Sequence, residues 1–438
     1  MEAHRELIDV SPDRAEPGFG EIAFVMVLLF LTSGAFLASL QGDDATSLGT
    51  RTGTLLTNVI WASMYVMTAI LVVQHCKGSQ LSLRRGWLFL APIGIAIASL
   101  AWSDDGASTF LRCVALIGTT LQSYYLAVRF STRRLLQILG WVGAISLVLC
   151  YIFALFFPRI GIGTDLFEGD WLGIFPHKNS LGGNAALWFL AFLVLSASEE
   201  KKPWGARFAA GASLLLVFLS HSVTSLVTCM LVLAIYLGRR LFWLPRWLYL
   251  AGSLGIGVLL NWELTSESFG SVAASLGRDP SLTGRTEIWA LVWIMILDKP
   301  FLGYGYGAFW RGLEGPSEFI WRSFGMPLFY SHNGFLDLWL DVGLVGLVLF
   351  LAGFAVCFKR AVEVFKRWRN SESMWPLLFL IFLFISNLTE GSILRVNVLP
   401  WLVYMTIAFK LARVTTGPQR ERLASGEDDD TARSSGLD

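Results

Sequence analysis

The sequence predicts an all-α polytopic membrane protein, and three features of its composition support that fold class. Of the 438 residues, 54% are hydrophobic and only 15% are charged, whereas soluble domains average about 25% charged residues. The apolar residues gather in long runs. The 18 Trp and 32 Phe suit a chain that crosses membrane interfaces many times. A chain this apolar could not cover its surface in water, so the composition excludes a set of soluble domains.

Twelve apolar runs are candidates for membrane-spanning helices. A bilayer core about 30 Å thick needs about 20 mostly apolar residues per helix. In chain order the runs are 20–40, 53–73, 87–101, 110–128, 135–157, 181–197, 206–220, 223–237, 247–262, 335–357, 375–388 and 396–411. The two runs on either side of 220–222 could instead form one bent span.

The basic residues predict the orientation of these spans. If the N-terminus is cytoplasmic, about 24 of the 34 Lys and Arg fall on inner segments, and every short outer loop is poorer in them than its inner neighbours. We therefore expect both termini inside and about 12 spans. The first run reads as a span rather than a cleaved signal peptide, because mixed charges precede it and many further spans follow.

The predicted organisation has five parts. These are a cytoplasmic segment 1–19, spans one to nine in 20–262 with an outer loop 158–180, a long periplasmic loop 263–334, spans ten to twelve in 335–412, and a disordered cytoplasmic tail 413–438. The net charge of +1 gives no bulk field that would favour nucleic acid. The 5 Cys show no CxxC spacing, which argues against a disulfide framework and a zinc site.

The long outer loop contains a predicted interfacial or re-entrant helix. Thr283 is a plausible N-cap, Glu287 suits a first helical turn, and the apolar run 288–297 is too short to span. Arg285 stands against the helix dipole at this N-terminus. Either it snorkels to lipid headgroups, or it holds an anion together with the exposed N–H groups of the helix start.

Two further stretches of this loop carry candidate residues. The run GYGYGAFW at 303–310 reads as a tight turn, and the rings of Tyr304 and Tyr306 could stack on sugar faces or belong to an interface belt. The run SHNG at 331–334 opens the tenth span, with Ser331 as a plausible cap. His332 is either a polar boundary residue or a proton acceptor.

Polar residues beside these stretches extend the candidate site. Asn333, Asp337 and Asp341 lie near enough to His332 along the helix to orient its ring or hold its charge. In the outer loop 158–180, His177, Lys178 and Asn179 either cap and anchor a helix start or form another arm around an anionic headgroup. The carboxylate pairs at 43–44 and 104–105 could bind Mg²⁺, although solvated turn ends are the simpler interpretation. No metal-ligand spacing joins His177, His221 and His332, so we expect no metal site.

Four stretches together resemble the bacterial O-antigen ligase and polymerase superfamily (the Wzy-like proteins), and within it the exopolysaccharide polymerases of the ExoQ type. They are AWSDD at 101–105 with Arg112, GIFPHKNSLG at 173–182, LTGRTEIW at 282–289 through GYGYGAFW at 303–310, and SHNGFLDLWLDVGLVG at 331–346. The resemblance implies a membrane glycosyltransferase of the C type that needs neither metal nor nucleotide sugar. It places functional roles on Arg285 and His332. Where relatives carry a cation this chain has Val223, so His221 or Lys178 would have to substitute.

The function implied is polymerisation of an exopolysaccharide or O-antigen-type glycan at the outer face of the bacterial inner membrane. A glycan on polyprenyl diphosphate would be transferred onto a lipid-linked repeat unit, without a cofactor, and with inversion at the anomeric carbon. A chain-length regulator and export proteins are candidate partners. The alternatives are a ligase that acts on lipid A core, and a flippase for lipid-linked oligosaccharides. A flippase should line mid-membrane with charges, whereas Arg112 is nearly the only one here.

Overall fold

The computed structural model describes residues 16–36, 55–76, 83–164, 168–197, 204–241, 255, 284–325 and 328–413. Within these ranges the chain is helical, and the one extended pairing is an isolated bridge between Ile162 and Trp171. The helices are α1 (Phe19–Thr32), α3 (Leu55–His75), α4 (Leu83–Ala98), η3 (Ser99–Ala101), α5 (Gly106–Arg129), α6 (Thr132–Phe156), α7 (Pro158–Gly161), α8 (Lys178–Ser196), α9 (Trp204–Leu219), α10 (Val223–Leu241), α13 (Gly284–Asp298), η6 (Gly312–Glu314), α14 (Glu318–Phe324), α15 (Gly334–Trp368), α16 (Ser371–Ser386) and α17 (Leu399–Arg413). The predicted all-helical fold is confirmed for this part of the chain.

The predicted spans can be compared with these helices one by one. The ninth span, 247–262, lies outside the described residues apart from Gly255. The expected N-cap Thr283 and the tail beyond residue 413 also lie outside them. Each of the other eleven predicted spans overlaps a helix. By length and apolar composition, α3, α6, α8 and α15 are able to cross a bilayer, and several shorter apolar helices accompany them. The runs around 220–222 form two separate helices, α9 and α10, which pack on each other and on α8. The total of twelve and the orientation stay predictions.

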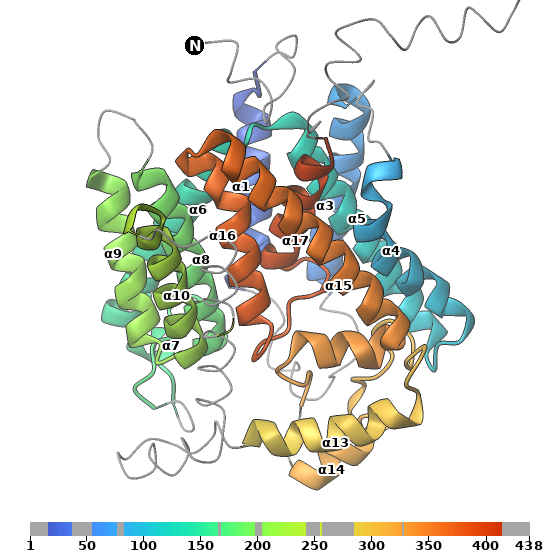
Figure 1. Cartoon of the computed structure of the whole chain (residues 1–438). Helices are drawn as coiled ribbons and strands as arrows, with labels where there is room; N and C mark the ends of the chain where they lie inside the picture. Colours follow the sequence, from blue (N-terminus) through green and yellow to red (C-terminus); the bar gives the residue numbers. More distant parts are fainter. Residues whose placement is uncertain are drawn as a thin grey trace, which may run out of the picture.

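The bundle is organised around helices that are apolar on all sides. α16 is buried along nearly its whole length and packs against α8, α10, α15 and α17 (Figure 1). A helix that is apolar all round belongs in a core or in lipid. The peripheral helix α3, in contrast, exposes a row of large apolar side chains, among them Leu55, Val59, Val66, Ile70 and Val73. Such a face is suited to contact lipid tails.

Helix α15 is broken near its N-terminal end, and backbone groups of the preceding loop replace the lost hydrogen bonds. Gly343 has φ 69° and ψ −175°, which interrupts the helical hydrogen bonds. The loop segment 300–305 supplies replacements: Leu344 N donates to Pro300 O at 2.9 Å, and Tyr304 N donates to Leu340 O at 2.8 Å. A Cβ at position 343 would collide with the carbonyl of Phe301. Only glycine fits there, because the position combines positive φ with backbone contact.

The predicted short helix of the long loop is confirmed as α13, which forms a cap with α14 at one end of the bundle (Figure 1). Its 15 residues would extend only about 22 Å, too short to span a bilayer. The cap has a small core of its own, built from Ile288, Val292, Ile296, Tyr304, Phe309, Trp310, Ile320, Leu328 and Leu340. Because Leu340 belongs to α15, this core ties the cap to the helix that follows it.

The orientation can be tested by cysteine labelling. Ser323 in the cap and Lys366 near the end of α15 are both exposed, whereas all five native cysteines are buried. We expect a membrane-impermeant maleimide to label Ser323→Cys in intact spheroplasts and Lys366→Cys only after lysis. The native chain, unlabelled in both states, is the control. The opposite pattern would place the cap in the cytoplasm and overturn the predicted topology.

Candidate active site

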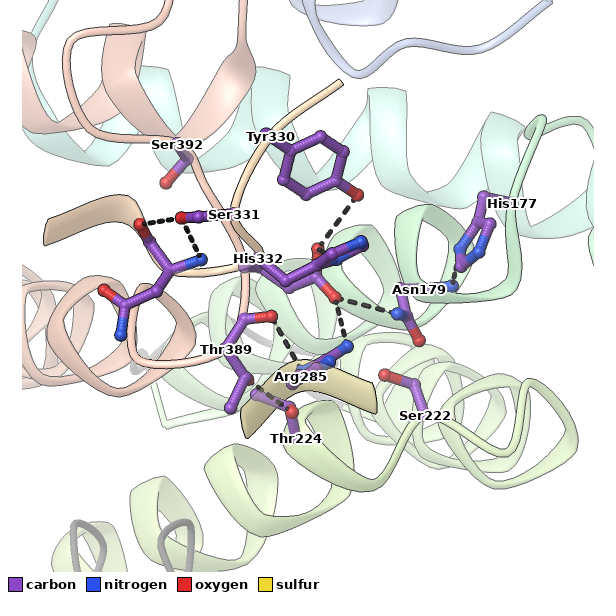
Figure 2. Close-up of polar contacts among 12 residues, drawn as sticks. His177, Asn179, Ser222, Thr224, Arg285, Tyr330, Ser331, His332, Thr389 and Ser392 are labelled. Carbon is purple, nitrogen blue, oxygen red and sulfur yellow. Dashed lines mark hydrogen bonds and ion pairs between the residues drawn. The ribbon is translucent and has the colours of Figure 1, made fainter. Parts of the chain in front are cut away.

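Five segments that are far apart in sequence converge at the end of the bundle under the cap (Figure 2). They are the starts of α8, α10 and α13, the approach to α15 at 328–333, and the turn 387–398 between α16 and α17. Asn387 organises that turn, since its side-chain oxygen accepts from Ser392 N at 2.7 Å and from Ile393 N at 3.2 Å. Gly334 N donates to the carbonyls of Asn387 and Glu390, both at 2.9 Å. The turn is thereby fixed against the start of α15.

Arg285 points into this junction. Only 9% of the residue is exposed. One terminal guanidinium nitrogen donates to the Thr389 carbonyl at 2.8 Å, and the other lies 3.2 Å from a carboxylate oxygen of Glu390. The Thr389 hydroxyl bonds that of Thr224 at 2.6 Å, which links the start of α10 to the same point. In this geometry the arginine faces the protein interior, so the headgroup-anchor interpretation does not describe its position.

Glu390 is the central group of the site, although no motif in the sequence points to it. Besides Arg285, its carboxylate accepts from the Asn179 amide at 2.8 Å and from the Tyr330 hydroxyl at 3.4 Å. Burial raises the pKa of Glu390 against the opposing effects of these partners. The only sequence signal was one acid in a short turn between two apolar runs, and such an acid usually reads as solvated.

His332 lies beside this carboxylate in a strained position. Its φ of 55° is left-handed, which is uncommon for a residue other than glycine. Its Nδ1 is 4.0 Å from Glu390 and, within the described residues, is buried without a hydrogen-bond partner. Burial first, and then the charges of Arg285, His177 and Arg395, lower the pKa of His332 to about 3. The ring is therefore neutral at pH 7, and the same shift makes it a weaker base than a solvated histidine.

The residues that follow His332 fix the start of α15, and among the described residues none of them forms a hydrogen bond with the ring nitrogen Nδ1. Ser331 was the expected N-cap residue of α15, but Asn333 is the N-cap. Its side-chain oxygen accepts from Phe335 N at 3.0 Å and from Leu336 N at 3.2 Å. The expectation failed because Ser331 uses its hydroxyl on the backbone of Asn333. Asp337 accepts from Ser331 N and from the Trp310 indole, each at 2.9 Å. It therefore joins the cap to the loop that carries His332.

The arm 177–179 reaches the same place from α8. His177 is the N-cap of α8, where its Nδ1 accepts from Asn179 N at 3.1 Å, and burial lowers its pKa to about 4. Lys178 instead forms an ion pair with Asp170 at 2.8 Å. His221 bonds the other oxygen of the same carboxylate. Of the predicted residues, Arg285, His332, His177 and Asn179 meet, whereas Lys178 and His221 form a neighbouring group around Asp170.

The structure places Arg112, Tyr304 and Tyr306 elsewhere, around the glycine-rich loop. Arg112 packs against Gly307 and interacts electrostatically with Asp341. Only 2% of Tyr304 and 4% of Tyr306 are exposed, so neither ring presents a face to a sugar here. The Tyr306 hydroxyl donates to the Leu394 carbonyl, and this hydrogen bond helps to fix the turn 387–398. These residues support the site without lining it.

A substitution at Gly307 tests this supporting role. Gly307 has φ 70°, and a Cβ there would collide with the Arg112 side chain. We expect Gly307→Ala to destabilise the protein by at least about 1–3 kcal/mol, the usual cost of strained backbone. Melting of the purified protein in detergent would measure it. Gly211→Ala is the matched control, because a Cβ at that helical glycine meets nothing within 4 Å. Equal melting temperatures for the two variants would contradict the packing argument.

The candidate metal-binding pair at 104–105 is engaged with cations. Asp104 bonds Lys299 at 2.6 and 2.8 Å. Asp105 caps α5 and pairs with Arg311 at 3.0 Å. Across the described ranges, no group of three or more His, Cys, Asp and Glu is arranged to hold a metal ion. The pair at 43–44 lies outside the described residues.

Comparisons with known proteins agree with the resemblance seen in the motifs. Residues 208–351 match the family model described as O-antigen ligase, a stretch that includes Arg285 and His332. The chain is 28% identical over 384 residues to the exopolysaccharide production protein ExoQ of Rhizobium meliloti, covering 84% of this chain and 79% of that protein. It is 32% identical over 139 residues to the O-antigen ligase of Pseudomonas aeruginosa, covering 31% of this chain and 29% of that one.

Among solved structures, a chain described under "Structural coordination of polymerization and crosslinking by a peptidoglycan synthase complex" aligns with a TM-score of 0.43 and 15% identity, covering 76% of this chain and 98% of that one. The sequence comparisons confirm the predicted resemblance: residues 208–351 match the O-antigen ligase family, and the chain is similar to ExoQ over most of its length.

Proposed function

We propose that this ExoQ homologue is a membrane polysaccharide polymerase. It transfers a glycan from polyprenyl diphosphate onto a lipid-linked repeat unit at the outer face of the inner membrane. One observation carries the proposal: an inward-facing arginine and a neutral, partly accessible histidine lie on the same buried carboxylate. Arg285 is 3.2 Å from Glu390, and His332 is 4.0 Å from it. A cation for a departing diphosphate and an acceptor for a hydroxyl proton are the two groups that this transfer needs.

The chemistry follows from these positions. The acceptor hydroxyl attacks the anomeric carbon while its proton passes to the free ring nitrogen of His332. The bond from that carbon to the diphosphate oxygen breaks, and its electron pair leaves with the diphosphate, whose charge Arg285 stabilises. Attack opposite the leaving group inverts the anomeric centre. No energy source beyond the activated donor is needed.

Glu390 gives His332 its direction in this scheme. If Nδ1 carries the proton, its N–H can donate to the Glu390 carboxylate once their present separation of 4.0 Å shortens. Nε2 is then the unprotonated nitrogen and faces the acceptor hydroxyl. Catalytic hydrogen bonds are often long in the empty state and tighten with substrate. The diphosphate also offsets the charge of Arg285, one of the groups that lower the pKa of His332. Substrate binding therefore strengthens the base when it is needed.

Reconstitution tests the proposal. The purified full-length chain is incubated with polyprenyl-diphosphate-linked repeat units in the presence of EDTA, and products are resolved by mass spectrometry. We expect lipid-linked dimers and longer oligomers, with the new linkage inverted relative to the donor. Free polyprenyl diphosphate should appear in equal amount. Activity that requires added Mg²⁺ or Mn²⁺, or a retained anomeric configuration, would contradict the mechanism.

The second candidate function is ligation to a lipid A core acceptor. The match of residues 208–351 to the O-antigen ligase family favours it, because that stretch contains both Arg285 and His332. A competition assay separates the two functions. With lipid-linked repeats and lipid A core offered together, a polymerase lengthens the lipid-linked chain, whereas a ligase loads the core. Movement of the intact lipid-linked oligosaccharide across vesicles without transfer would instead indicate a flippase.

A further inference from the structure

A diphosphate at this site needs more positive charge than Arg285 alone offers. The diphosphate carries at least two negative charges at neutral pH. Arg285 already donates hydrogen bonds to the Thr389 carbonyl and to the Glu390 carboxylate. Lys178 and His221 are both paired with Asp170. A second cation with unused donors must therefore lie close to His332 if the leaving group is to be held at both phosphates.

Arg395 meets this requirement. It comes from the turn 387–398, the same turn that supplies Glu390. Its guanidinium carbon lies 4.8 Å from the centroid of the Tyr330 ring, and the Tyr330 ring lies 4.2 Å from that of His332. The three flat groups thus lie side by side in space, in the order Arg395, Tyr330 and His332. Its charge is also one of those that act on His332.

The guanidinium of Arg395 is held in place by one partner, and most of its N–H donors remain available. One terminal nitrogen is 3.2 Å from Asp337, and this is the only side-chain hydrogen bond of Arg395 among the described residues. A guanidinium has five N–H donors in a fixed fork. Its side chain is 36% exposed, whereas that of Arg285 is 11% exposed. Arg395 therefore presents free donors to a ligand from a fixed orientation.

The backbone around Arg395 is built to hold this position. Leu394 has φ 57°, and its carbonyl accepts the hydroxyl of the buried Tyr306. Asp337, which fixes the guanidinium, is itself bound by Trp310 and by the backbone of Ser331 next to His332. A solvated surface arginine would need none of these supports.

We propose that Arg395 is the second cation of the diphosphate site. Arg285 and Arg395 flank the Tyr330–His332 pair and between them bind the two phosphate groups of a polyprenyl diphosphate. This assignment rests on the proposed function, and it concerns the leaving group rather than the acceptor. A polyprenyl monophosphate, with one phosphate group, engages only one of the two cations.

Binding of two probes tests the assignment. The full-length protein in detergent is titrated with polyprenyl diphosphate and with polyprenyl monophosphate of the same chain length. We expect the native chain to prefer the diphosphate. Arg395→Lys keeps the charge beside Asp337 but loses the fork, and should reduce that preference by about tenfold or more, since one hydrogen bond to a charged group is lost. Arg395→Gln should reduce it further.

A matched control and a stability measurement separate binding from folding. Arg322→Lys changes a cap arginine that pairs only with Glu318 in the described structure and is 71% exposed; it should leave the preference unchanged. Equal loss of affinity for both probes with a lower melting temperature would mean that Arg395 is structural, and an unchanged preference would also overturn the assignment. If the native chain binds neither probe, the proposed function falls as well, which is a different result from failure at Arg395 alone.

Discussion

Replacing His332 with alanine is expected to slow glycan transfer by about 10²–10⁴-fold, the usual effect of losing a general base. The pKa of His332 is lowered to about 3, so its ring is neutral at pH 7, and 20% of its side chain is accessible. Initial rates of dimer formation from lipid-linked repeats would measure the loss. In cells, single repeats should accumulate on the lipid while the protein reaches the membrane at its normal level.

His332→Gln and His75→Ala complete this experiment. Glutamine keeps much of the shape but cannot take up a proton, so it should be nearly as slow as alanine. His75 ends α3, near Glu21 and far in sequence from the site, so its loss should leave the rate unchanged. Polymer of normal length and yield from His332→Gln would show that the residue is only a boundary residue.

The pH dependence offers an independent check on His332. Because its pKa is lowered to about 3, the base form of the empty protein persists far below the ordinary value of 6.5. The pH profile of kcat/KM, which reports the free enzyme, should therefore not fall near pH 6.5 because of His332. Any fall that is seen there should also be seen in His332→Gln. A limb centred at pH 6–7 that is absent from that variant would mean that the ring is not buried as described.

Arg285→Lys is expected to reduce the rate by about 10²–10³-fold, close to the cost of losing one fixed contact to developing charge. Two different guanidinium nitrogens contact the Thr389 carbonyl and Glu390 at 2.8 and 3.2 Å. A lysine amine is a single point on a flexible stem and cannot reproduce a planar two-point contact. Transfer by the purified variant and accumulation of lipid-linked single repeats would both report the defect.

Arg311→Lys is the matched control for Arg285. Arg311 also belongs to the long loop and is largely buried, but it pairs with Asp105 outside the junction. It should retain transfer close to the native rate. If Arg285→Lys makes polymer as well as Arg311→Lys does, then charge alone suffices at position 285, and transfer does not depend on the two-point contact with Thr389 and Glu390.

Sequence reasoning identified helices and polar motifs better than it identified their partners. α13 was predicted because a ten-residue apolar run cannot span a membrane. Arg285 stood out because it opposes the helix dipole, and His332 because an imidazole can take up a proton near neutral pH. Glu390 and Arg395 were missed because nothing local marks them: a lone acid and a lone arginine in a short turn read as solvated charges. Their importance depends on Asn387 and Gly334, which fold that turn against the start of α15, far earlier in the chain.

The break in α15 was also beyond the sequence. Gly343 sits inside a run that reads as one uninterrupted span, and an isolated glycine in such a run is common in membrane helices. What makes it a break is the backbone of 300–305, which takes over the hydrogen bonds that the helix gives up.

The joint between the cap and α15 also constrains how the protein is made. Four backbone hydrogen bonds cross it, from Leu344 to Pro300, Val345 to Phe301, Tyr304 to Leu340, and Gly305 to Asp341. The residues on the α15 side are translated after the whole cap. During synthesis we therefore expect these four hydrogen bonds to form only after the first turns of α15 have been made. An excised fragment of residues 284–334 would lack these partners and Leu340 of the cap core, so we expect it not to fold by itself.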